Sequence, residues 1–165
     1  MEKDLVIRER LEHEGLMDFK GFYNFMYNWL KSEGFTVYED EYVEKVSGEF
    51  KELRIKWKVS KQLSDYFKVE YNIKTEVRRM SDVEVEIEGK KKKMQKALME
   101  MDFKGSLVKD VDSGWEGHSW LRFMREIYDK YVIPKRIFDL KQRIEDDLKE
   151  LRNQLKRYLD HIGRS

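Results

Sequence analysis

Two carboxylates within one expected strand are placed for acid–base chemistry. Glu39 and Glu41 lie two positions apart in 35–46, so strict alternation would turn both toward the apolar side of a sheet. Burial raises the pKa of a carboxyl, and a second carboxylate nearby raises it further, which is how general acids arise. A β-bulge is the structural alternative, because one extra residue would turn Tyr38 and Tyr42 inward instead.

The lysine run at 90–93 is a second candidate, since clustered cations can contact phosphates. The whole chain has 34 Lys and Arg against 33 Asp and Glu, and its formal net charge of +1 supplies no global field for a polyanion. We therefore interpret the run as the solvated tip of a hairpin and expect no nucleic-acid partner.

The other reactive side chains form no recognisable catalytic or metal-binding arrangement. His13, His118 and His161 have no metal-ligand spacing, and we interpret the glycines of the loop 114–118 as serving a turn that leads into a helix. The sequence contains no phosphate-binding glycine loop, nucleophile elbow or paired metal motif. It therefore predicts no cofactor and no metal, and it gives no support for enzymatic activity.

Composition indicates one folded domain. A chain of 165 residues with 40% apolar and 13% aromatic residues can bury a substantial core, and its 41% of charged residues must coat that core. The absence of Cys suits a reducing compartment, and no window approaches the roughly 18 apolar residues of a spanning helix. We expect a single cytoplasmic domain over 1–165 with no transmembrane segment.

Alternation of apolar and charged residues predicts an antiparallel sheet in the middle of the chain. The runs 53–59, 67–77 and 83–87 each place apolar side chains on one face and charged or polar side chains on the other. The segments 5–11 and 91–101 fit either a strand or a helix, and alternation favours the strand in both.

Helices are expected before and after these strands in the sequence. An apolar stripe at helical spacing marks 19–32, with Asp18 as its N-cap. A second stripe follows Ser119. Pro134 then interrupts the pattern, so a new helix is expected over 135–162.

Together these elements predict an α+β fold, in which an antiparallel β-meander of five to six strands packs against an N-terminal helix and long C-terminal helices. This element order resembles that of helix-grip proteins. In those proteins a C-terminal helix lies across a curved antiparallel sheet and encloses an apolar ligand cavity. The resemblance concerns element order alone, and it implies a cavity between the sheet and the last helix.

The last helix suggests a non-enzymatic interaction or assembly module. Two interleaved heptad tracks give it a narrow coiled-coil seam. The seam can pack on the chain's own sheet, on the aromatic helix before Pro134 or on another chain, and packing within the chain is favoured for its first part. A helix over 135–162 would be about 40 Å long, so we expect its end to overhang the domain and to form a homo-oligomer. The expected partner-binding residues are Leu148, Leu151, Leu155, Tyr158 and Ile162.

The alternative hypothesis is a helix-grip-like carrier or sensor of a small apolar ligand held between sheet and helix. A cavity there would favour the carrier, and a filled core would favour assembly. The expected ligand-binding residues are Trp57, Tyr71, Met99, Met101 and Phe103.

Overall fold

The computed structural model describes residues 2–64, 66–109 and 133–163. Within them the chain forms an α+β fold with a five-stranded antiparallel sheet, a helix after the first strand and a C-terminal helix. The elements, in chain order, are β1 (Glu2–Met17), α1 (Phe19–Ser32), β2 (Thr36–Ser47), β3 (Phe50–Gln62), β4 (Phe67–Ile87), β5 (Lys90–Lys109) and α3 (Ile133–Gly163).

The strands pair in the order β1-β5-β4-β3-β2, so β2 to β5 form a meander and β1 joins it beside the last strand. The ambiguous segments 5–11 and 91–101 both lie in strands, as alternation favoured. The expected N-terminal helix is instead the second element, because β1 precedes it.

One expectation about the strands is wrong. The runs 67–77 and 83–87 were expected as two strands, but both belong to the 21-residue strand β4. A bulge between Arg78 and Ser81 shifts the register against β5 without ending the strand. The break in alternation therefore marks an irregularity within one strand.

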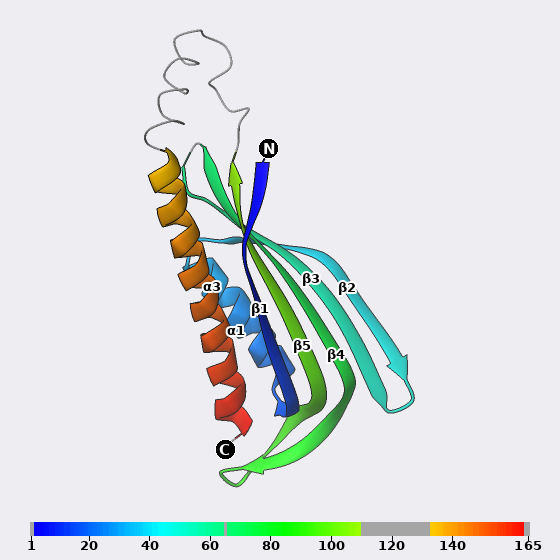
Figure 1. Ribbon diagram of the computed structural model, residues 1–165. Helices are drawn as coiled ribbons and strands as arrows, with labels where there is room; N and C mark the ends of the chain where they lie inside the picture. Colours follow the sequence, from blue (N-terminus) through cyan, green and yellow to red (C-terminus); the bar gives the residue numbers. More distant parts are fainter. Residues whose placement is uncertain (1, 65, 110–132, 164–165) are drawn as a thin grey trace.

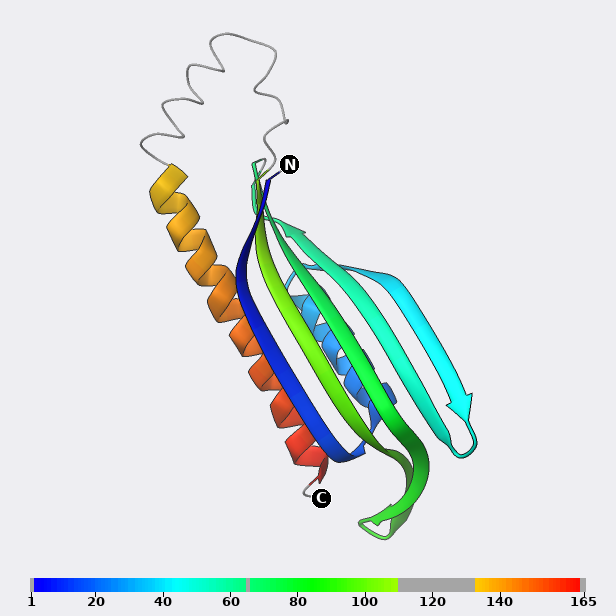
Figure 2. The same cartoon turned by 45° about the vertical axis from the view of Figure 1, so that its right-hand side comes forward.

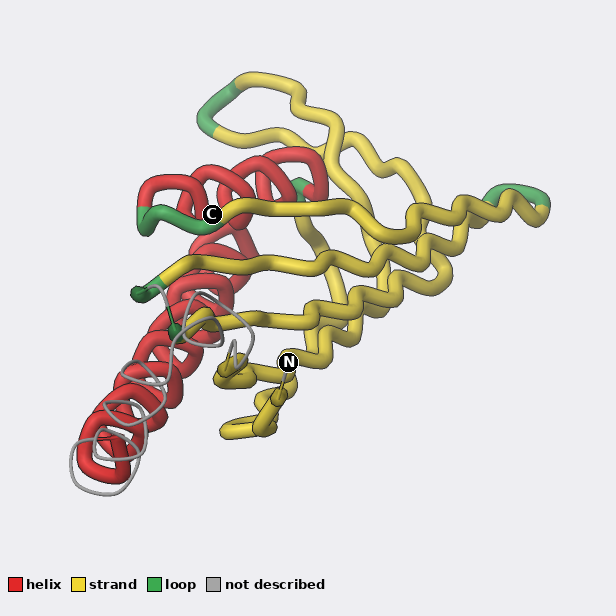
Figure 3. Tube along the Cα trace, turned by 90° about the horizontal axis from the view of Figure 1, so that it is seen from above, coloured by secondary structure: helices red, strands yellow, loops and turns green. Residues whose placement is uncertain are grey.

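Both helices lie on one face of the sheet (Figures 1 and 2). α3 runs along β1 and contacts β5, while α1 contacts β2 and α3. The view from above shows the helices gathered on one side of the molecule and the strands spread away from them (Figure 3). No described element covers the opposite face, which we call the helix-free face.

The start and end of α1 follow from local chemistry. The side chain of Asp18 accepts a hydrogen bond from the backbone N–H of Gly21 at 3.2 Å, which confirms the predicted N-cap. Phe22, Met26 and Leu30 form the buried stripe of the helix. Gly34 follows its end with a φ of 89°, a conformation that glycine adopts at little cost.

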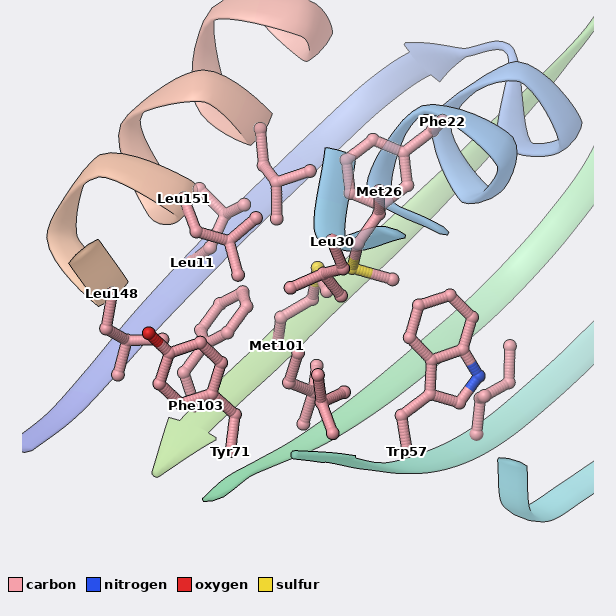
Figure 4. Packing of buried hydrophobic residues seen from close by; sticks show 14 of the residues in the cluster. Leu11, Phe22, Met26, Leu30, Trp57, Tyr71, Met101, Phe103, Leu148 and Leu151 are labelled. Carbon is pink, nitrogen blue, oxygen red and sulfur yellow. The ribbon is translucent and has the colours of Figure 1, made fainter. Parts of the chain in front are cut away.

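Period-two alternation decides which strand side chains enter the core. Trp57 of β3 and Tyr71 of β4 are 3% and 1% exposed, whereas Lys56 and Lys58 face solvent. Among the described residues the Trp57 Nε1 atom is the sole buried side-chain N or O without a hydrogen-bond partner, so the core is otherwise satisfied. Figure 4 shows side chains of the sheet meeting those of both helices: Leu11, Trp57, Tyr71, Met101, Phe103, Phe22, Met26, Leu30, Leu148 and Leu151.

α3 comes very close to the sheet over Gly105 of β5. A Cβ atom at this position would lie 3.1 Å from Cγ2 of Ile7, 3.2 Å from Cγ2 of Ile144 and 3.2 Å from Cδ2 of Leu148. All three distances are shorter than ordinary van der Waals contact. α3 therefore occupies space that a side chain at position 105 would need.

The expected overhang of the last helix is not seen. Leu148, Leu151 and Leu155 are 0% exposed and Leu159 is 1% exposed, all within the chain's own core. The exposed apolar side chain lies near the start of α3, where Phe138 is 68% exposed. The sheet is long enough to accommodate the far half of the helix because its strands reach 21 residues.

Pro134 lies within the first turn of α3, where proline is tolerated, so the helix begins one residue before it. The helix expected after Ser119 lies outside the described residues.

We predict that Gly105→Val lowers the free energy of unfolding by ~1–3 kcal/mol, because the new methyl groups overpack the contact with α3. Urea denaturation measures this change. Lys104→Val is the matched control, since it introduces the same side chain one position away on the helix-free face and should not lower the free energy of unfolding. Equal midpoints for the two variants would contradict the assignment of the two faces.

Candidate functional site

The expected ligand-binding residues lie in a filled core. Trp57, Tyr71, Met99, Met101 and Phe103 are each at most 3% exposed. Between the sheet and α3, the space lined in part by Phe35, Tyr71 and Ile144 amounts to about 10 Å³, which is scarcely enough for one water molecule. This space is too small for an apolar ligand.

The described partner-binding residues also lie close together, but they pack in the chain's own core. Leu148, Leu151 and Leu155 are buried beneath α3, and the ring of Tyr158 stacks on Phe25 of α1 at 4.9 Å between centroids. The side chain of Ile162 lies outside the described residues. The coiled-coil seam is therefore occupied within the chain, and its role in self-association is not supported.

Glu39 and Glu41 do not share a face, because a bulge lies between them. Strand β2 shifts register at this point, so that Glu39 is opposite Trp57 whereas Glu41 is opposite Lys56. Glu39 accepts a hydrogen bond from the Tyr23 hydroxyl at 2.6 Å on the helix-bearing face. Glu41 forms ion pairs with Arg54 at 3.3 Å and Lys56 at 3.2 Å on the helix-free face. The geometry provides no carboxylate pair for acid–base chemistry.

The lysine run lies at a hairpin, and His13 and His161 lie near the ends of β1 and α3. Residues 90–93 begin β5 beside the β4–β5 turn and are all exposed, and Lys93 forms an ion pair with Asp82 at 3.4 Å. The Nε2 atom of His13 is 2.9 Å from the backbone oxygen of Leu16. His161 is exposed near the end of α3, and His118 and the loop 114–118 lie outside the described residues.

A row of polar side chains crosses the helix-free face, and sequence reasoning missed it. The cross-strand register places Arg8 opposite Lys104, Lys104 opposite Asn72, Asn72 opposite Lys58, and Lys58 opposite Tyr38. We call these five residues the basic row. They line a hollow of about 610 Å³, and a neighbouring hollow of about 370 Å³ shares its Arg8, Asn72 and Lys104 walls.

Two cations of the basic row are directly opposed. Arg8 and Lys104 face each other on β1 and β5, and neither forms an ion pair with any described residue. Opposed side chains in an antiparallel sheet have Cβ atoms about 5 Å apart, so like charges at such positions are destabilising. The fold thus places two positive charges side by side without an ion pair from residues 2–64, 66–109 or 133–163.

Glu70 is a buried carboxylate beside the basic row. Its side chain is 6% exposed, and Lys3 contacts it at 2.7 Å and Lys58 at 4.0 Å. The Asn72 Nδ2 atom lies 3.5 Å from the same carboxylate oxygen. Burial alone would raise the pKa of Glu70, but the hydrogen bond and charge of Lys3, the charge of Lys58 and the contact with Asn72 together hold that pKa below its ordinary value.

A row of acidic residues lies on the same face as the basic row. Four residues along the strands, Glu12 lies opposite Glu100, which in turn lies opposite Glu76. At about 3.3 Å per residue this acidic row is about 13 Å from the basic row. The mixed row between them contains Arg10, Asp102, Lys74 and Lys56.

The basic row could have been suspected from outward-facing cations on three strands, because Lys58, Lys104 and Arg8 all occupy non-core positions of their alternating patterns. Their alignment was hidden, since it depends on the strand order and on four registers that no single strand determines.

We predict that Leu155→Asp unfolds the chain instead of dissociating an oligomer, because an unpaired carboxylate would replace a fully buried side chain. The expected loss is ~3–5 kcal/mol of unfolding free energy, measured by urea denaturation. Asn153→Asp, on the exposed side of α3, should leave stability nearly unchanged. A folded Leu155→Asp variant of lower mass by light scattering would instead support the helical seam as an interface.

We predict that Glu70 contributes stability that is present above the ordinary pKa of a glutamate and is lost as pH falls through its lower, folded-state pKa. Unfolding free energy measured from about pH 7 to about pH 3 should therefore fall less steeply for Glu70→Gln than for the wild type. Glu52→Gln, which changes an exposed carboxyl on the same face, should retain the wild-type slope. A Glu70→Gln curve parallel to the wild type would contradict the role of Lys3 and Lys58 as its partners.

The described residues contain no group of three His, Cys, Asp or Glu side chains that could hold a metal ion. No helix within 2–64, 66–109 or 133–163 is long and apolar enough to cross a membrane. No protein-family model, no curated protein and no solved structure matches this chain.

Proposed function

We propose that the protein is a non-enzymatic binding module whose helix-free face holds a small, multiply charged anion such as a phosphate ester. The observation that supports the proposal is the opposed pair of Arg8 and Lys104, which has no counterion among the described residues. An anion between them would relieve their repulsion and accept charge-assisted hydrogen bonds from both.

The rest of the basic row supplies further contacts for such an anion. Lys58 adds a third cation, and the Asn72 amide between Lys58 and Lys104 can donate or accept hydrogen bonds. Tyr38 is 63% exposed and offers an aromatic surface to the uncharged part of an organic anion. The hollow of about 610 Å³ is within the size range of small-molecule sites.

The proposed ligand is small because the positive region is small. The acidic row of Glu12, Glu100 and Glu76 lies on the same face and pairs with Arg10, Lys74 and Arg78, so unpaired positive charge does not continue along the strands toward a longer polyanion. The formal net charge of +1 adds no long-range attraction. This argument agrees with the expectation that nucleic acid is not a partner.

Binding is proposed instead of catalysis because the acidic groups near the row lack a catalytic environment. Asp40 and Asp102 border the hollow, and both are exposed. Catalytic carboxyls usually lie in desolvated surroundings, and neither of these side chains does. The buried Glu70 is held in its charged form by Lys3 and Lys58.

The proposal keeps the class expected from the sequence, a non-enzymatic binding protein, but moves the binding surface. A homo-oligomer through α3 and an apolar ligand between sheet and helix would both use side chains that are buried in the chain's own core. Arg8 and Lys104 of the basic row are instead exposed and form no ion pair with a described residue.

We predict that inorganic pyrophosphate binds to the wild type and that Lys104→Gln weakens this binding about tenfold, the effect of losing one charge-assisted hydrogen bond. Isothermal titration calorimetry measures the affinity. Lys92→Gln is the matched control, because it removes the same charge from the hairpin tip, and it should leave the affinity unchanged. Glu70→Gln should strengthen binding, because it removes the carboxylate that attracts Lys3 and Lys58.

If Lys104→Gln and Lys92→Gln weakened pyrophosphate binding equally, the change would follow from net charge alone. That result would overturn the proposed site. Absence of pyrophosphate binding would overturn it as well. A single-stranded oligonucleotide that binds far more tightly than pyrophosphate would replace the small anion with a polymer.

A further inference from the structure

A groove on the helix-bearing face, independent of the basic row, lies between the start of α1 and strand β2. It has a volume of about 430 Å³ and is open to solvent. We call it the aromatic groove, and its lining residues are Phe19, Lys20, Tyr23, Glu39 and Tyr42.

The bulge in β2 assembles this groove. Because the register shifts between Glu39 and Glu41, Tyr42 pairs with Ile55 and is on the helix-bearing face together with Glu39. Unbroken alternation would have placed Tyr42 on the opposite face from Glu39. One extra residue thus brings the Glu39 carboxylate and the Tyr42 phenol to the same surface, where Tyr42 is 48% exposed.

The rings of the groove are held by packing. Tyr23 lies 6.2 Å from Phe19 between ring centroids and forms an edge-on contact with Trp57 at 4.9 Å. Its hydroxyl donates a hydrogen bond to Glu39 at 2.6 Å, which fixes the carboxylate beside the rings. The side of the groove formed by Phe19, Tyr23 and Glu39 is therefore ordered before any ligand binds.

The wall of the groove contains one carboxylate, Glu39, and one ammonium group, Lys20, together with the phenols of Tyr23 and Tyr42. Burial raises the pKa of Tyr23, and the hydrogen bond and charge of Glu39 raise it further. Burial likewise raises the pKa of Tyr42, followed by the charges of Glu44 and Glu39. Both phenols stay neutral at physiological pH, and the faces of neutral aromatic rings attract cations.

We infer that the aromatic groove binds a small organic cation, an alkylammonium ion, between the rings of Tyr23 and Tyr42 with Glu39 as its counterion. Aromatic faces stabilise the alkyl groups and the positive charge together, and a carboxylate adds a direct Coulombic contribution. A neutral apolar ligand would gain only the first of these effects, and an anion would be repelled by Glu39.

Lys20 belongs to the wall of the groove and is the chain's own competitor for it. The side chain is exposed and forms no ion pair with a described residue. Its ammonium group raises the local positive potential, so its removal should make the groove more receptive to a cation.

We predict that choline binds weakly to the wild type and that its neutral isostere 3,3-dimethyl-1-butanol does not, as measured by chemical-shift titration up to about 50 mM. Tyr42→Leu should weaken choline binding about fivefold through loss of the cation–π contact. Glu39→Gln should weaken it at least as much while keeping an acceptor for the Tyr23 hydroxyl. Lys20→Met should strengthen binding.

The matched control is Tyr38→Leu, which makes the same change on the same strand but on the helix-free face, and it should leave choline binding unchanged. Equal binding of the neutral isostere would reduce the groove to an apolar surface and overturn the inference. Absence of choline binding to both the wild type and Lys20→Met would also overturn it. Pyrophosphate binding to the Glu39→Gln variant should equal that of the wild type, so the two sites are tested separately.

Discussion

The close approach of α3 to the sheet over Gly105 determines how the two faces of the molecule are used. Without a Cβ at that position, Ile144 and Leu148 reach the floor of the sheet, and the helix can lie along β1 and β5. This contact commits one face to the core and covers the side of the sheet that ends in β1. The opposite face is left to charged side chains, and β2 is left as the open edge.

Some charged side chains on the helix-free face stabilise the sheet, whereas others destabilise it. Many of them are paired across strands, as Arg54 and Lys56 are with Glu41, which fits a surface that favours the correct register. Arg8 and Lys104 oppose each other instead. A sheet selected only for stability would be expected to place an acid at one of these two positions. Unfavourable pairs that persist in a fold are more informative about binding than the favourable ones.

Alternation alone predicted the inward faces of β3 and β4, because burial of Trp57 and Tyr71 outweighs every other contribution along those strands. Asp18 was identifiable as an N-cap because capping is local. The sequence near Asp40 is acidic and aromatic at successive positions and fits two registers, so it favours a structural role for Glu39 and Glu41 but does not by itself distinguish a bulge from regular alternation.

The apolar stripe of α3 and its packing within the chain were expected from the sequence, but the burial of its far half in the same core was not. A seam that includes Leu148 and Leu155 has the same spacing whether it packs on a sheet or on a second helix. The basic row and the aromatic groove each require side chains from distant parts of the chain. Neither could be inferred before the strand order and the registers were known.

The pairing of β1 with β5 also has a consequence for biosynthesis and folding. Glu2 pairs with Lys109 and Met17 with Gln95, so β1 is synthesised before β5, the strand with which it pairs. The intervening hairpins can form from local contacts, whereas closing β1 onto β5 orders a long loop in one step and is expected to be slow. During that interval β1 presents unpaired backbone and a half-apolar surface to the cell. Its high density of charged residues, with Arg8, Glu9, Arg10 and Glu12 nearly in succession, would keep the waiting strand hydrated.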